Sequence, residues 1–140
     1  TSNIDLTNVN AVSVSAETIT VSESLFLSSV TYEDASLNTS SSSSPTQITL
    51  NSPIILFNIS NNSNNYYTDI SNQGQSGQTL DIFMETNGGT VRVDFGTNTL
   101  VTGGGIFRYL TFNSIGQSAS LIYVGSKWRI RNCGALPSAS

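Results

Sequence analysis

The sequence predicts an all-β protein: an antiparallel sandwich or barrel-like head with a short β-rich, shaft-like segment before it. Apolar residues recur two apart in short runs, and glycine and asparagine separate the runs in the second half, as in proteins built from short strands. The 140 residues suffice for one compact domain. We divide the chain into an assembly segment at residues 1–38, a joint at residues 39–46 and a head domain at residues 47–140.

The first segment carries pairs of apolar residues in a strand-like spacing. The pairs are Ile4/Leu6, Val12/Val14, Ile19/Val21, Leu25/Leu27 and Val30/Tyr32. The residues between them are mostly polar, so each narrow strand leaves an apolar stripe and two open edges that a lone chain has little to cover. Association with identical chains would cover both, which predicts a shaft-like segment. Alternatively, the segment supplies outer strands to the head.

The serine-rich stretch at residues 39–46 contains nothing that could be buried and includes a proline, so it is predicted to be a flexible joint. Residues 47–50 and 53–59 after it are strand-like, and residues 60–65 are predicted to be a loop of turn-forming residues. Three glycosylation sequons begin at Asn38, Asn58 and Asn61, but in a chain so rich in Asn and Ser chance explains them more simply.

Strand-like runs alternate with glycine-rich turns in the C-terminal half, which predicts an antiparallel meander. We expect strands at residues 80–85, 90–95, 106–112, 119–124 and 127–131. The pair Asn87-Gly88 suits the positive φ angles of a tight hairpin turn between the first two strands. The triple glycine at 103–105 predicts another turn, where Gly104→Val should disturb folding if that residue needs a positive φ.

Alternation within these runs predicts which side chains face the core. The candidates are Val91, Val93, Phe95, Leu121, Tyr123, Trp128 and Ile130. Arg92 lies on the other face of its run, where we expect it to pair with Asp81 or Glu85 across the hairpin. Ile122 and Val124 also lie opposite the core face, which predicts burial on both sides or a subunit interface.

The composition disfavours several classes of function. A net charge of −4 with five scattered cations gives no broad basic surface, so nucleic acid is not an expected partner. No apolar run approaches the roughly 20 residues of a membrane helix, and no membrane insertion is expected. The chain begins at Thr1 without a signal-like segment, so we expect a processed form or a fragment. The lone Cys133 is expected to be a free thiol.

No catalytic, metal or cofactor site is predicted. The sequence has no histidine, so Ser-His-Asp and Cys-His sites are impossible and the commonest metal ligand is missing. A glycosidase would need two close carboxyl groups, for which Asp81 with Glu85 and Asp69 with Asp94 are the candidates. Asp81 and Glu85 would lie about 13 Å apart along a strand, beyond the usual range. Salt bridges to arginine are the simpler explanation for these carboxylates.

Three aromatic residues are candidates for binding a ligand. Tyr66, Tyr67 and Trp128 could form a platform for a sugar, because exposed aromatic rings commonly line binding surfaces. Tyr66 and Tyr67 also stand beside an amide-rich loop. Alternatively, these rings lie on a strand edge and cover the core.

Several stretches of the C-terminal half carry a resemblance: residues 88–91 (GGTV), 103–106 (GGGI), 110–112 (LTF) and 115–130 (IGQSASLIYVGSKWRI). Their order is similar to that in the C-terminal domain of viral fibre and virion surface proteins, found in bacteriophage tail fibres and in large DNA viruses. The resemblance covers residues 47–134. The polar residues 60–77 depart from it, which suggests a surface loop particular to this protein.

The resemblance implies a non-enzymatic virion structural protein, fibre or spike-like, on the virion surface. It implies a homotrimer whose partners are its own copies and other virion proteins, with host surface glycans as partners if the protein contributes to host attachment. Two alternatives remain at this point. One is a carbohydrate-binding, lectin-like module, and the other is a capsid coat or cement protein.

Overall fold

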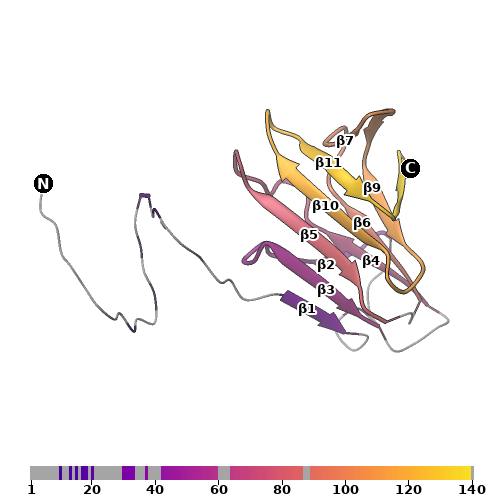
Figure 1. Cartoon of the computed structure of the whole chain (residues 1–140). Coiled ribbons are helices and arrows are strands. Elements are labelled where there is room, and N and C mark those ends of the chain that lie inside the picture. The colour runs from indigo at the N-terminus through magenta and orange to yellow at the C-terminus, as the bar shows by residue number, and fades with distance from the viewer. Residues whose placement is uncertain are drawn as a thin grey trace, which may run out of the picture.

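The strands of the computed structural model form two sheets (Figure 1). Residues 10, 13, 15, 17, 18, 20, 30–33, 37, 42–59, 64–86 and 89–139 are described. The seven-stranded sheet has the order β1 (Val30–Glu33), β3 (Ile54–Asn58), β5 (Thr79–Met84), β10 (Ser118–Tyr123), β11 (Trp128–Cys133), β7 (Leu100–Thr102) and β8 (Gly105–Phe107). The five-stranded sheet has the order β12 (Leu136–Ser138), β9 (Tyr109–Phe112), β6 (Gly89–Asp94), β4 (Asn64–Asp69) and β2 (Thr46–Gln47). The predicted all-β class is confirmed.

From β1 to β6 the chain alternates between the two sheets. Strands β1, β3 and β5 are parallel neighbours in one sheet, and β2, β4 and β6 are parallel neighbours in the other. Residues that pair between neighbouring parallel strands lie 22 to 27 positions apart in sequence, which is the length of one turn if the strands form a coil. Val30 pairs with Ile55, Ile54 with Asp81, Thr46 with Thr68 and Asn64 with Gly89, at separations of 25, 27, 22 and 25 positions. A repeat of this kind suggests a two-sheet β-solenoid.

The second half of the chain closes the coil with antiparallel strands. Strand β10 pairs antiparallel with β5 in one sheet, and β9 pairs antiparallel with β6 in the other. The outer edge of the last strand of the coil in each sheet is therefore paired. Strands β10 and β11 form the predicted hairpin, whose turn contains Gly125 and Ser126 at φ 63° and 59°. The antiparallel prediction thus fails for β1 to β6 and holds for this half except for β7, which pairs in parallel with β11.

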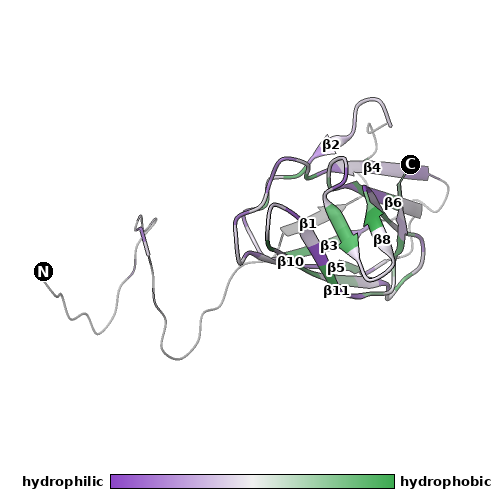
Figure 2. Ribbon diagram, turned by 90° about the horizontal axis from the view of Figure 1, so that it is seen from above, coloured by the Kyte–Doolittle hydropathy of each residue, from purple (hydrophilic) through white to green (hydrophobic). Residues whose placement is uncertain are grey.

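The core lies between the sheets, with β2, β4 and β6 on one side and β1, β3, β5, β10 and β11 on the other (Figure 2). Its largest fully buried side chains include Trp128, Tyr66, Phe57, Phe95, Phe112, Leu80 and Ile82. The predicted core residues Val91, Val93, Phe95, Leu121 and Trp128 are buried, while Tyr123 and Ile130 are partly buried and pack against the core.

The predicted hairpin between residues 80–85 and 90–95 is wrong. Strands β5 and β6 belong to different sheets, because each finds a parallel partner one turn earlier, β3 and β4 respectively. A short turn signal looks the same whether the chain returns to the same sheet or crosses to the other. The two residues of that signal, 87 and 88, lie outside the described residues.

The polar stretch at residues 60–77 was predicted to be a surface loop, but part of it is a strand. It contains β4, in which Tyr66 and Thr68 are each 1% exposed and face the core. The polar flanks hide this alternation of buried residues. The single strand predicted at 106–112 is also divided, into β8 and β9, which lie in different sheets on either side of Arg108.

Most of residues 1–38 lies outside the described residues, so its role as a shaft stays a prediction. Strand β1 is a described part of that segment and pairs in parallel with β3. The first residues of the joint at 39–46 also lie outside the described residues, so its flexibility stays a prediction. Within the part of the chain that the structure describes, no helix has the length and apolar character needed to cross a membrane.

Candidate functional site

The three aromatic residues predicted to bind a ligand occupy three different environments. Tyr66 of β4 lies within the core, and Trp128 of β11 is also buried, each with 1% exposure. Tyr67 is half-buried and faces the other side of β4, because successive residues of a strand point to opposite faces of a sheet. The structure therefore does not bring the three rings together on one surface.

Tyr67 belongs to a row of stacked tyrosine and arginine side chains on the outer face of the five-stranded sheet. The Arg92 guanidinium carbon lies 4.7 Å from the centre of the Tyr67 ring and 4.3 Å from that of Tyr109. The Arg108 guanidinium carbon lies 5.0 Å from the Tyr109 ring centre. The salt bridge predicted from Arg92 to Asp81 or Glu85 is wrong, because Arg92 lies on the other sheet and stacks on these rings instead.

Arg108 holds Asp94 through a two-pronged ion pair beside this row. Its Nε donates to both carboxylate oxygens at 2.9 and 3.1 Å, and its Nη2 donates to Oδ2 at 2.7 Å. These hydrogen bonds raise the pKa of Arg108 above its ordinary value. Asp94 also accepts the N–H of Gly96 at 2.8 Å. The pair therefore ties the loop after β6 to the bend between β8 and β9.

Asp69 stands opposite Asp94 in the register of β4 and β6. Partial burial disfavours its charged form, but hydrogen bonds from Ser71 and Gln47 outweigh this and lower the pKa of Asp69. Gln47 Nε2 donates at 2.8 Å and the Ser71 N–H at 2.6 Å. A glycosidase pair needs a carboxyl group with a raised pKa as its acid. Asp69 has a lowered pKa and Asp94 is ion-paired, so a structural role explains both.

The Asp69→Asn variant should lose less stability in acid than the wild-type protein. Because the folded pKa of Asp69 lies below its unfolded value of about 3.9, the ionised carboxylate stabilises the fold above about pH 4 and this stabilisation is lost as the pH falls through the folded pKa. Urea unfolding at pH 7 and at several values below pH 4 measures the difference. Glu85→Gln removes an exposed charge as a control, and an identical acid profile for Asp69→Asn and wild type would contradict the expectation.

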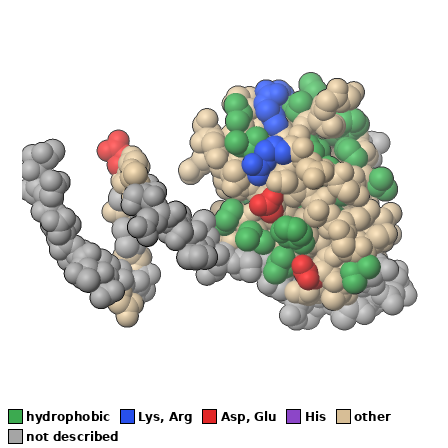
Figure 3. All heavy atoms as spheres, in the orientation of Figure 1, with side chains coloured by type: hydrophobic (Ala, Val, Ile, Leu, Met, Phe, Trp, Pro, Cys, Tyr) green, Lys and Arg blue, Asp and Glu red, His purple; other side chains and the backbone are tan. Residues whose placement is uncertain are grey.

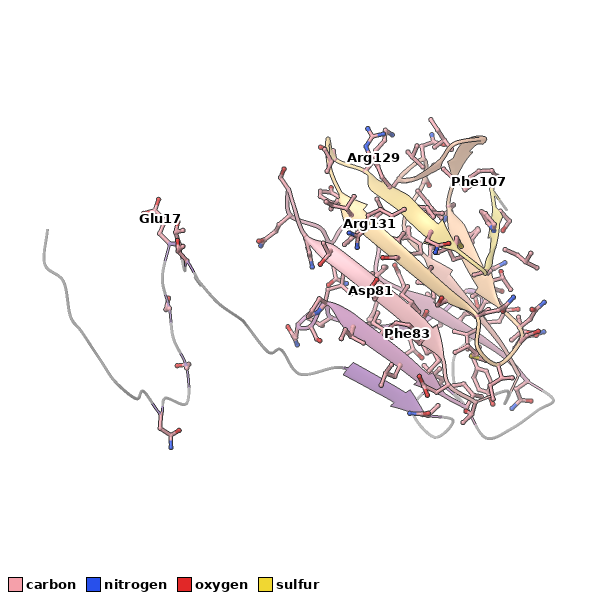
Figure 4. The ribbon with its side chains drawn as sticks, in the orientation of Figure 1. Glu17, Asp81, Phe83, Phe107, Arg129 and Arg131 are labelled. Carbon is pink, nitrogen blue, oxygen red and sulfur yellow. The ribbon has the colours of Figure 1, made fainter. Side chains whose placement is uncertain are left out.

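The outer face of the seven-stranded sheet carries an apolar patch beside a polar strip. We define the outer-face patch as Ile54, Leu56 and Phe83; Leu56 and Phe83 are register neighbours on β3 and β5, and Phe83 is 38% exposed. Figure 3 shows the apolar side chains low on this face, below the charged residues that Figure 4 labels. Of the two residues predicted to be buried on both sides or to lie at a subunit interface, Ile122 is half-buried and Val124 is 42% exposed.

Asp81 belongs to the polar strip above the patch, where its carboxylate has a structural role. The Ser120 hydroxyl donates to Asp81 Oδ1 at 2.6 Å, and Arg131 Nη2 donates to the Ser120 oxygen at 2.9 Å. These side chains come from β5, β10 and β11, three neighbouring strands. Asp81 is thus part of a hydrogen-bonded chain across the sheet rather than a member of a carboxylate pair.

The one cysteine is half-buried. Burial raises the pKa of the Cys133 thiol, which donates to the carbonyl of Ala135 with an Sγ–O distance of 3.4 Å. A thiol held in its protonated form is a poor nucleophile and a poor metal ligand. Over the described residues, no group of three or more Cys, Asp or Glu side chains is placed to hold a metal ion.

The candidate surfaces are therefore the tyrosine and arginine row, the outer-face patch and a hollow among the loops that Trp128 helps to line. Comparison of the chain with known protein families, with curated proteins and with solved structures finds no match. The resemblance to viral fibre and virion surface proteins accordingly stays a prediction.

Proposed function

We propose that this chain is a non-enzymatic structural protein that forms the closed end of a fibre or spike-like projection on a virion surface. The observation that supports this most is the asymmetry of the fold. Among the described strands, parallel strands coil from β1 to β6, and antiparallel strands cover the coil at one end only. Coiled repeat proteins need such capping elements to end a stack of strands.

The other end of the coil presents the edges of β1 and β2. Among the described strands, β1 pairs with β3 alone and β2 with β4 alone. The second edge of each strand therefore carries backbone N–H and C=O groups that a further strand could bind. An open parallel edge in both sheets, at the same end, is the arrangement by which a coil continues.

The sequence before β1 has the spacing that a continuing coil requires. Ile4 precedes Val30 by 26 positions and Ile19 precedes Thr46 by 27, within the 22 to 27 positions that separate paired residues in the described coil. Each is the first of a pair of apolar residues two apart. This supports residues 1–29 as the shaft-like part, which continues the coil away from the closed end.

We further propose that three copies associate side by side through the outer-face patch. Leu56 lies on β3, the neighbour of β1, and Phe83 lies on β5, the next strand, so the patch is near the β1 edge of the sheet. Partly exposed apolar side chains that are grouped on one face commonly mark contacts between subunits. Three-fold cyclic association would bury one patch per copy and leave the loops at the ends exposed.

Light scattering of the purified chain at micromolar concentration tests the association. Wild-type protein should have three times the mass of the monomer, and Phe83→Thr, which keeps a strand-forming residue but removes the ring, should shift the population toward monomers by tenfold or more. Ile115→Thr changes a side chain that is 64% exposed elsewhere and should leave the mass unchanged. A monomeric wild-type protein would rule out the homotrimer.

The capped coil is tested separately by electron microscopy. A longer chain that includes residues 1–140 should appear as a rod, with the head at its tip. A compact globule without a rod would contradict the projection, whatever its oligomeric state.

A further inference from the structure

Three hollows lie in a row among the loops at one end of the sandwich. The first, about 420 Å³, lies between the loop after β4 and the loop after β6 and includes Asn72 and Gln73. The second, about 370 Å³, shares these two residues and extends to Gln75 and Gln78. The third, about 390 Å³, shares Gln75 and Gln78 and extends to Asn51. Shared lining residues place the three hollows side by side, and we call this row the amide groove.

The amide groove is lined by neutral hydrogen-bonding groups and aromatic rings. Amide side chains line its length, and Thr97, Tyr123 and Phe95 line the first hollow. Its lining includes a single charged side chain, Arg108, which is neutralised by Asp94. Asp69 is close enough to influence Arg108 and adds a further negative charge near it. The local balance therefore disfavours anionic ligands and suits neutral ones.

Some of the amides build the groove, and others remain available to a ligand. Gln73 donates from Nε2 to the Ile48 carbonyl at 2.5 Å and accepts the Leu50 N–H at 2.8 Å, so both ends of its amide help to fix the loop. Within the described part of the chain, the Asn72 amide and the Tyr123 hydroxyl make no hydrogen bond. Both line the first hollow.

The walls of the first hollow are held in place before any ligand binds. The Trp128 indole N–H donates to the Gln73 carbonyl at 3.1 Å, and the Tyr123 ring stacks edge-on against Trp128 with centroids 5.2 Å apart. Gly74 also packs against Tyr123, where a Cβ would lie 2.5 Å from the ring. Asn72 is fixed in the left-handed region at φ 60°. A fixed site loses little entropy on binding.

We propose that the amide groove binds a neutral, linear oligosaccharide, with Asn72 and Tyr123 as hydrogen-bonding residues in the first hollow. Amides and hydroxyls match the hydroxyl and acetamido groups of neutral sugars, and the aromatic ring offers a face to a sugar's C–H groups. The three linked hollows suit several sugar units in a row rather than one. This site differs from the Tyr67 surface, which lies on the outer face of the five-stranded sheet.

A glycan array followed by calorimetry tests the assignment. The probes are neutral linear hexose and N-acetylhexosamine oligomers, with uronic-acid and sialylated oligomers as the acidic comparison. Neutral oligomers should bind, and affinity should rise from the disaccharide to longer chains because more hollows are filled. No binding of neutral oligomers, or a preference for the acidic ones, would overturn the assignment.

Matched variants locate the binding. Asn72→Gly keeps the left-handed backbone and removes only the amide, and Tyr123→Phe removes only the hydroxyl; each should weaken binding about 2- to 13-fold, as expected for one hydrogen bond. Asn98→Gly is the control, because Asn98 is also left-handed, at φ 58°, and lies outside the groove lining. Equal losses in Asn72→Gly and Asn98→Gly, or a loss with Tyr67→Phe instead, would overturn the proposed site. The mass measured by light scattering should not change in any of these variants.

Discussion

Replacing Trp128 with alanine should lower the free energy of unfolding by about 3–5 kcal/mol, which is a large part of the stability of a domain of this size. Trp128 is 1% exposed and packs edge-on against Phe95 and Tyr123, with ring centroids 6.3 and 5.2 Å away. Its removal would leave a cavity between the loops and the core and would also free the Gln73 carbonyl from its hydrogen bond. Urea unfolding followed by circular dichroism measures the change.

Two further variants separate the contributions at this position. Trp128→Phe retains most of the apolar contact but removes the indole N–H, so it should cost less than alanine and still leave the Gln73 carbonyl without its donor. Ile115→Ala alters a side chain that is 64% exposed and should change stability by no more than about 0.5 kcal/mol. A loss at Trp128→Ala as small as that at Ile115→Ala would show that the indole does not pack as the structure has it.

The parts of the fold that could be predicted from the sequence are those with local signals. The hairpin of β10 and β11 was predictable because its turn falls at Gly125-Ser126 and apolar residues alternate on both sides. Burial of Leu121 and Trp128 follows from the same alternation. Antiparallel neighbours close in sequence leave a pattern of this kind, since the turn and both strands lie within about 15 residues.

The parallel coil could not be predicted, because its partners are far apart in sequence. Pairing across 22 to 27 positions leaves no turn signal between the partners, and each crossing between sheets resembles an ordinary hairpin turn. Strand β4 was missed for a different reason. Only Tyr66 and Thr68 of its six residues face the core, and a threonine on an inward face gives no apolar signal.

The candidate site was predictable only in its chemistry. The sequence suggested a sugar ligand through its aromatic residues, and the prediction attached it to Tyr66, Tyr67 and Trp128, with an amide-rich loop beside the first two. The groove combines the loops after β4 and β6 with Tyr123 and with the predicted Trp128, which meet only in the folded chain. Asn72 and Gly74 stand in a turn-like stretch with positive φ values, but the packing of Tyr123 against Gly74 joins residues far apart in sequence and leaves no local signal.

Substituting valine for Gly74 should be among the most destabilising changes at any glycine. Gly74 has φ 145°, where a valine backbone is strained by about 1–3 kcal/mol. Its Cβ would also lie 2.5 Å from two atoms of the Tyr123 ring, which packs against Trp128 as well, and such overpacking adds about 1–3 kcal/mol. Thermal and urea unfolding should show both losses, together with a weakened amide groove.

Two other glycines separate the backbone strain from the steric clash. Gly77 has φ 86° but open space around it, so Gly77→Val should show the strain alone. Gly104 has neither a positive φ nor a neighbour within 4 Å of a Cβ, so the sensitivity first predicted for Gly104→Val is not expected. The losses should rank Gly74, then Gly77, then Gly104. If Gly74→Val and Gly77→Val were equally destabilised, Tyr123 would have to move freely, and the groove wall it forms would not be fixed before a ligand binds.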